Sequence, residues 1–259
     1  MKPVKTLLSI ILVLLVASCS KKNTYEKGFR VGPTSVQTET EDEKGLNNDS
    51  LNFETRPGDV LLTGISNLRL TPVYKVNYNR DNNSTFTGSN LFYSSYYQSE
   101  EISNWDNNLM PGIEAVYGYN MVNVSLFDLK DGKIKNLFDK PVLIRTIYYP
   151  AFSNDSIKGK PVLRQYFMIS AYNEDTNKDG FINLKDLRRF YLFDTTGTKK
   201  KPLVPENYSV FKSAYDWEND LMYVYAQLDT NSNGNLDKGE PVHVFWIDLN
   251  NPEKSGRQY

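Results

Sequence analysis

An internal repeat is the feature of this sequence that most constrains its fold. Asp175-Thr176-Asn177 recurs as Asp229-Thr230-Asn231, and Phe193-Asp194 recurs as Ile247-Asp248, each after 54 residues. An earlier copy, Leu126-Phe127-Asp128, lies 66 residues before Leu192-Phe193-Asp194, and the extra length fits an insertion near residues 154–160. A repeat of this period predicts stacked supersecondary units.

The composition of each unit predicts β-strands. From about Arg56, short runs rich in Tyr and Phe are separated by Asn, Asp, Gly and Pro, and no run has a long 3.6-residue period. The expected strands cover residues 68–77, 91–97, 121–129, 142–149, 163–172, 190–194, 208–215, 221–228 and 242–249. Each unit is predicted to consist of a strand, a turn, a second strand, a polar loop and a third strand that ends in aspartate. A short basic strand follows, such as residues 133–138 or 199–204. We predict an all-β fold of repeated four-stranded antiparallel units, like the blades of a β-propeller.

Two turns carry a resemblance to a known family. The segment from Pro150 to Asp155 resembles the Pro-x-Phe-Ser-Pro-Asp-Gly turn of WD40-like repeats in TolB-type propellers, and the segment from Asp216 to Asp220 resembles a diverged copy. Both copies lack the second proline and the glycine, and about three units fit the chain where that family has six. The resemblance covers about residues 120–259. It leaves open a small propeller of about four blades, an open arc or a curved stack of sheets, and we predict a propeller-like repeat domain over residues 57–259.

The first eighteen residues have the layout of a secretory signal. Lys2 and Lys5 precede an apolar run over residues 7–16, which is shorter than the about 20 residues of a membrane-spanning helix. The stretch Val16-Ala17-Ser18-Cys19 resembles the lipobox of bacterial lipoproteins. This resemblance implies a signal peptide over residues 1–18 and lipid, including palmitate, on Cys19. The alternative is an ordinary signal peptide with an incidental cysteine.

The residues after Cys19 predict a flexible tether and a cellular location. Residues 20–56 are polar and charged with few core-forming side chains, so we expect residues 19–56 to be a lipidated, flexible N-terminal segment. By resemblance to lipoprotein sorting rules, Ser20 implies the outer membrane. Lys21-Lys22 departs from the acidic signals of surface lipoproteins and favours the periplasmic side.

Charge and cysteine content limit the partners. Without residues 1–18 the chain keeps 28 basic and 31 acidic side chains with no basic cluster, which argues against a nucleic-acid partner. Cys19 is the only cysteine, so the domain has no internal disulfide. We expect the membrane as a partner through the lipid on Cys19, and the TolB resemblance implies an envelope protein partner.

Two polar loops match the twelve-position calcium loop of EF-hands. The pattern places oxygen ligands at positions 1, 3, 5, 7, 9 and 12 and glycine at position 6. The predicted calcium ligands are Asp175, Asn177, Asp179, Phe181 (through its carbonyl), Asn183 and Asp186 in the first loop, and Asp229, Asn231, Asn233, Asn235 (through its carbonyl), Asp237 and Glu240 in the second. Asn, Asp and Gly also form plain hairpin turns, which is the alternative. A plain turn does not require an apolar residue at position 8 or an acid at position 12.

The flanks of these loops predict a structural role for calcium. Residues 221–228 form a β-type run and Pro241 leads into another, while the first loop has room for one helical turn over residues 184–188. The loops therefore lack the helix pair that makes EF-hand sensors switch.

The sequence shows no catalytic constellation, and we expect no enzyme. His243 is the only histidine and alternates with apolar neighbours in a strand, and no nucleophile elbow or phosphate-binding glycine loop occurs. We therefore predict a calcium-stabilised binding or scaffold module. The alternative is a glycan-binding or glycan-processing lipoprotein that uses aromatic side chains such as Tyr93, Tyr96, Tyr97 or Trp105.

Overall fold

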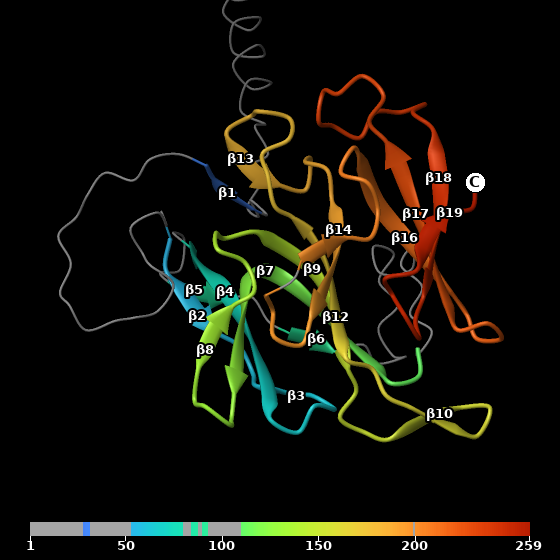
Figure 1. Cartoon of the computed structure of the whole chain (residues 1–259). Helices are drawn as coiled ribbons and strands as arrows, with labels where there is room; N and C mark the ends of the chain where they lie inside the picture. The colour runs from blue at the N-terminus through green and yellow to red at the C-terminus, as the bar shows by residue number, and fades with distance from the viewer. Residues whose placement is uncertain (1–27, 32–52, 80–83, 88–89, 93–109, 199) are drawn as a thin grey trace, which may run out of the picture.

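The protein has an all-β, antiparallel architecture (Figure 1). The computed structural model describes residues 28–31, 53–79, 84–87, 90–92, 110–198 and 200–259, and none of these residues is helical. The strands are β1 (Gly28–Arg30), β2 (Thr55–Pro57), β3 (Leu61–Leu62), β4 (Leu68–Asn79), β5 (Ser84–Thr87), β6 (Asn90–Phe92), β7 (Ile113–Asp128), β8 (Ile134–Asn136), β9 (Leu143–Pro150), β10 (Asp155–Ile157), β11 (Lys160–Val162), β12 (Tyr166–Tyr172), β13 (Phe181–Asn183), β14 (Arg189–Asp194), β15 (Lys200–Pro202), β16 (Tyr208–Asp216), β17 (Leu221–Leu228), β18 (Val242–Asp248) and β19 (Ser255–Arg257).

A four-stranded antiparallel order recurs three times among these strands. It runs β2-β4-β7-β8, then β9-β12-β14-β15, then β16-β17-β18-β19. The third strand of each unit ends in Asp128, Asp194 or Asp248, and in each case Oδ1 accepts a hydrogen bond from the backbone amide two residues ahead, at 2.9, 3.0 and 2.9 Å. The hairpin β10–β11 lies at the expected insertion. The repeat therefore corresponds to a real structural unit.

Of the forms left open for the units, the closed propeller is not seen, since the described strands make no closed propeller or barrel. The reason is the length of β7. Its C-terminal part pairs with β4 and β8, while its N-terminal part pairs with β6 and β9. The first two units are thereby joined into one 11-stranded sheet, and only the third forms a separate four-stranded sheet, at the right of Figure 1.

Two hydrophobic layers hold the units together. Alternate side chains of a strand point to opposite faces, and in β14 Tyr191 and Phe193 enter one cluster while Phe190 and Leu192 enter the other. The first cluster lies between the first and second units. The second lies between the second unit and the four-stranded sheet, which contributes Met222, Val224 and other buried side chains. The middle unit is thus buried on both faces.

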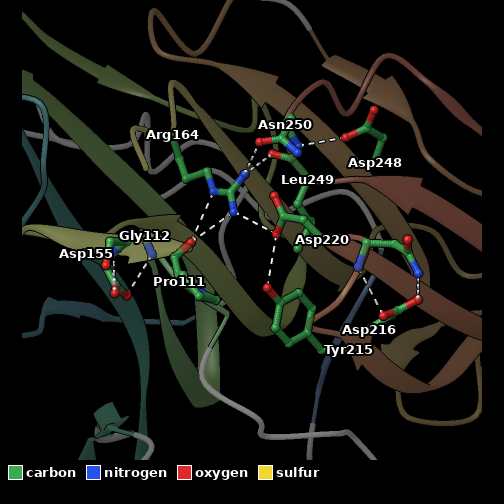
Figure 2. Close-up of polar contacts among 12 residues, drawn as sticks. Pro111, Gly112, Asp155, Arg164, Tyr215, Asp216, Asp220, Asp248, Leu249 and Asn250 are labelled. Carbon is green, nitrogen blue, oxygen red and sulfur yellow. Dashed lines mark hydrogen bonds and ion pairs between the residues drawn. The ribbon is translucent and has the colours of Figure 1, made fainter. Parts of the chain in front are cut away.

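A buried arginine adds a polar link between the same two units. Arg164, which lies between β11 and β12, forms an ion pair at 2.9 Å with Asp220 of the turn between β16 and β17 (Figure 2). Its guanidinium also donates to the carbonyl oxygens of Pro111 and Leu249. Tyr215 donates its hydroxyl hydrogen to Asp220 Oδ1 at 3.1 Å. Both charged side chains are almost fully buried, and these partners replace much of the water that they have lost, although Asp220 Oδ2 is buried without a hydrogen-bond partner among the described residues.

Candidate metal centre

The two predicted calcium loops lie at one end of the molecule, at the top of Figure 1. The first loop, residues 175–186, connects β12 to β14 and contains β13. The second loop, residues 229–240, connects β17 to β18. Each loop follows a strand, so the strand-loop-strand setting predicted from the flanks is confirmed. The helical turn expected over residues 184–188 is wrong, because these residues form an irregular turn before β14.

The first loop is organised by hydrogen bonds to its own side chains. Asp175 Oδ1 and Oδ2 accept from the backbone amides of Asp179 and Gly180 at 3.0 and 2.9 Å. Asn177 Oδ1 accepts from the same Asp179 amide at 3.0 Å, and Asp179 Oδ1 accepts from Phe181 at 3.0 Å. The side chains at positions 1, 3 and 5 are therefore all directed into the turn.

The second loop repeats these bonds position by position. Asp229 Oδ1 and Oδ2 accept from the amides of Asn233 and Gly234 at 3.1 and 2.9 Å. Asn231 Oδ1 accepts from the Asn233 amide at 2.9 Å, and Asn233 Oδ1 accepts from Asn235 at 2.8 Å. The two loops therefore share one local fold although their sequences differ at several positions.

The backbone conformation is shared as well. Position 4 has a positive φ in both loops, 60° at Lys178 and 56° at Ser232. Position 6 has φ of 86° at Gly180 and 73° at Gly234, the left-handed region in which glycine is favoured. The sharp turn that the pattern predicted at glycine is thus present twice.

The acid at position 12 closes each loop onto its beginning. Asp186 Oδ1 accepts from the Thr176 amide at 2.8 Å, and its Oδ2 accepts from the Asn183 amide at 2.8 Å. Glu240 accepts from the amides at positions 2 and 9 of its own loop, at 2.9 and 3.3 Å. Burial raises the pKa of Asp186 above its usual range, and the backbone amides act in the opposite direction.

The residues at position 9 also point into the loops. Asp237 Oδ2 accepts from the side-chain amides of Asn231 and Asn233 at 3.0 and 2.6 Å, and these bonds lower the pKa of Asp237. Asn183 donates from its side chain to Asp179 Oδ2 at 3.4 Å.

The donor chemistry fits a hard cation. Every predicted side-chain donor is a carboxylate or amide oxygen, the ligand type that calcium requires. Over the residues that the structure describes, no group of three or more His, Cys, Asp or Glu side chains is arranged to hold a metal ion. The oxygens instead accept bonds from amides of the loop. Calcium binding therefore stays a prediction.

The two loops touch each other. Thr176 Oγ1 donates to Gly234 O at 2.7 Å, and Asn177 Nδ2 donates to Asn235 Oδ1 at 3.2 Å. A side chain at Gly234 would overlap the backbone of Thr176, so only glycine allows this approach. Sequence reasoning treated the loops as separate sites and missed this contact.

The structure also places part of the predicted tether on the first loop. β1 lies within residues 19–56 and pairs with β13, and β2 begins in the same segment at Thr55. The signal that could have revealed β1 was Phe29, an aromatic residue in a polar segment.

Cys19 lies outside the described residues, as do Tyr93, Tyr96, Tyr97 and Trp105. Over the residues that the structure describes, there is no helix long and apolar enough to cross a membrane.

His243 is held by a neighbouring tyrosine. Its Nδ1 lies 2.8 Å from the hydroxyl oxygen of Tyr208, and the two rings are 5.6 Å apart. Desolvation lowers the pKa of His243, with a smaller contribution from Arg257.

Comparisons with known proteins leave the chain without a family. A search against known protein families found no match, and a search of curated proteins found none either. A proposal about function therefore rests on the geometry of the loops and on the sequence patterns around them.

Proposed function

We propose that this protein is an exported bacterial lipoprotein, anchored through Cys19 and stabilised by calcium in its two loops, that serves as a binding or scaffold module in the cell envelope. The observation that carries the proposal is the position-by-position identity of the two loops. Two sequences that differ at several positions form the same bonds at positions 1, 3, 5, 6 and 12. A hairpin turn alone does not require this arrangement.

The role proposed for calcium is structural. Each loop joins strands of the sheets, and no helix pair is present in the described residues to transmit an opening movement. An ion would replace the backbone amides as the partner of side chains such as Asp229 and Glu240, and would bind only the folded loops. Such selective binding raises the free energy of unfolding. We expect an affinity typical of extracellular modules, with a dissociation constant of about 10⁻⁴ to 10⁻³ M.

The test is thermal unfolding of the protein with calcium and with a chelator. At about ten times a dissociation constant in this range, calcium adds about 1.4 kcal/mol to the free energy of unfolding and raises the melting temperature. The double variant Asp229→Ala and Glu240→Ala should lose the part of the rise that the second loop provides.

The matched control replaces one aspartate and one glutamate that lie outside both loops. Asp139→Ala with Glu218→Ala removes the same formal charge at exposed positions, and should keep the full calcium effect. Melting curves of the unaltered protein that coincide with calcium and with chelator would overturn the proposal.

A second candidate function, saccharide binding, is favoured by one observation. The face of the four-stranded sheet that points away from the second cluster carries an open groove of about 460 Å³. Its lining residues are Leu221, Tyr223, Trp246, Asp248, Lys254 and Gln258. Tyr223 and Trp246 are directly opposite each other on β17 and β18. Aromatic rings beside charged and amide side chains provide both an apolar surface and hydrogen-bonding groups for a sugar.

Affinity electrophoresis in gels containing soluble polysaccharides tests this alternative. Trp246→Ala should abolish any retardation of the protein, whereas Trp217→Ala, which removes an exposed tryptophan in the turn between β16 and β17, should not. Equal migration of the unaltered protein in every gel would exclude the polysaccharides tested.

A further inference from the structure

The N-terminal strand β1 is bonded to the backbone of the first loop. It pairs antiparallel with β13, with Phe29 opposite Ile182 (Figure 1). The amide of Val31 extends this pairing by donating to Gly180 O at 2.9 Å. Gly180 and β13 occupy positions 6 to 9 of the proposed calcium loop, so β1 lies directly on that loop.

Side chains hold β1 in this position. Phe29 is buried in a cluster with Ile182 and with side chains of the large sheet, and its ring lies 5.1 Å from that of Phe53. Lys75 Nζ donates to Gly28 O at 2.6 Å. A side chain at Gly28 would overlap Ile182 O, so glycine permits the close approach.

The pairing of β1 depends on the shape of the loop. Within the described residues, β1 pairs only with β13, and β13 pairs only with β1. An isolated two-stranded pair is marginally stable in water, so it needs support from the structure around it. Here that support is the Phe29 cluster and the ordered loop. A ligand that orders the loop must therefore favour docking of β1, and docking must favour the ligand to the same degree.

We propose that calcium in the first loop controls the docking of β1, and thereby sets the length of chain between the lipid on Cys19 and the folded domain. This inference rests on the proposed function. With β1 docked, 8 residues (20–27) separate Cys19 from the docked strand. With β1 released, 35 residues (20–54) separate Cys19 from β2. Calcium would hold the domain close to the membrane surface.

Hydrogen exchange of the full-length lipidated protein in vesicles tests the inference. The exchange of residues 28–31 and 180–183 is compared in about 10 mM calcium, ten times the weak end of the expected affinity, and in chelator. We expect calcium to slow exchange in both segments by roughly fivefold or more, the lower end of measured couplings between sites. In parallel, titration calorimetry measures calcium binding itself.

Two variants separate docking of β1 from the integrity of the domain. Phe29→Asp places a charge in the buried cluster and should abolish the calcium effect on residues 28–31, and by reciprocity it should weaken calcium binding at the first loop. Val60→Asp places the same charge at an exposed side chain outside β1 and both loops and should leave both effects in place. Circular dichroism of each variant checks that the sheets are intact.

The outcomes distinguish the two levels of the proposal. If calcium binds and raises the melting temperature but residues 28–31 exchange equally in calcium and chelator, control of β1 is wrong and the proposed function stands. If calorimetry detects no calcium binding, the proposed function is wrong and the control of β1 fails with it.

Discussion

Thr176 Oγ1 donates a hydrogen bond to Gly234 O at 2.7 Å, and this bond joins the second position of one loop to the sixth position of the other. The loops belong to different units, one in the large sheet and one in the four-stranded sheet. An ion in either loop would therefore stabilise the contact between the units as well as its own loop.

The two position-6 glycines should differ in their tolerance of substitution. Gly180→Ala places a methyl group in open space, so its cost is the positive φ, about 1 to 2 kcal/mol. Gly234→Ala has the same backbone cost and must also push the Thr176 backbone away. We expect the larger loss of unfolding free energy for Gly234→Ala, measured by urea denaturation. Equal losses would show that the contact between the loops does not contribute to stability.

Loss of Arg164 should be strongly destabilising. Arg164→Met leaves the carboxylate of Asp220 buried without its cation, and breaking such a pair costs about 3 to 5 kcal/mol. The double variant Arg164→Met with Asp220→Leu removes both charges and should recover part of this loss. Urea denaturation measures each free energy. The exposed pair between Lys201 and Glu253 is the control, and Lys201→Ala should cost less than about 1 kcal/mol.

The protein should lose stability in alkali as buried tyrosines ionise. Burial raises the pKa of Tyr191 from its ordinary value of 10.0 to about 12. Because the folded pKa lies above the unfolded one, its contribution to stability is complete below pH 10 and is lost as the pH rises through 12. The shift corresponds to about 3 kcal/mol. Tyr191→Phe should flatten the decline in unfolding free energy over this range, and an unchanged decline would contradict this account of Tyr191.

Substitution of Cys19 should release the protein from membranes. Cys19→Ala removes the thiol that would carry lipid, and two or more acyl chains are what make such anchoring lasting. Detergent-phase partitioning should place the unaltered protein in the detergent phase and Cys19→Ala in the aqueous phase. Detergent partitioning that is unaffected by the substitution would contradict lipid attachment at this cysteine.

The strands of the repeat were predictable because their signal is local. The run of residues 221–228 corresponds to β17 at both ends, and the polar loop that follows has the expected bounds. The loop folds were predictable for the same reason, since Asp, Asn and Gly act on amides a few residues away.

The joining of two units into one sheet was not predictable from local pattern. Gly118 and Asn120 resemble the end of a strand, yet β7 continues through them. The register shifts between Tyr117 and Met121, and Asn120 has φ of 57°, so a bulge takes up the irregularity. The ion pair of Arg164 with Asp220 was also missed, because nothing in either local sequence indicates a partner 56 residues away.

Arg164 also bears on the order in which the chain can complete its fold. It belongs to the middle unit, but Asp220 and Leu249, which accept its hydrogen bonds, lie in the third unit, which is synthesised after the middle one. Before the strands of the third unit are synthesised, the guanidinium lacks these two partners and one face of the middle unit is uncovered. The middle unit can therefore complete its packing only after the third unit is synthesised. A chain that ends before residue 220 would lack the buried partners of Arg164 and the side chains that cover one face of the middle unit.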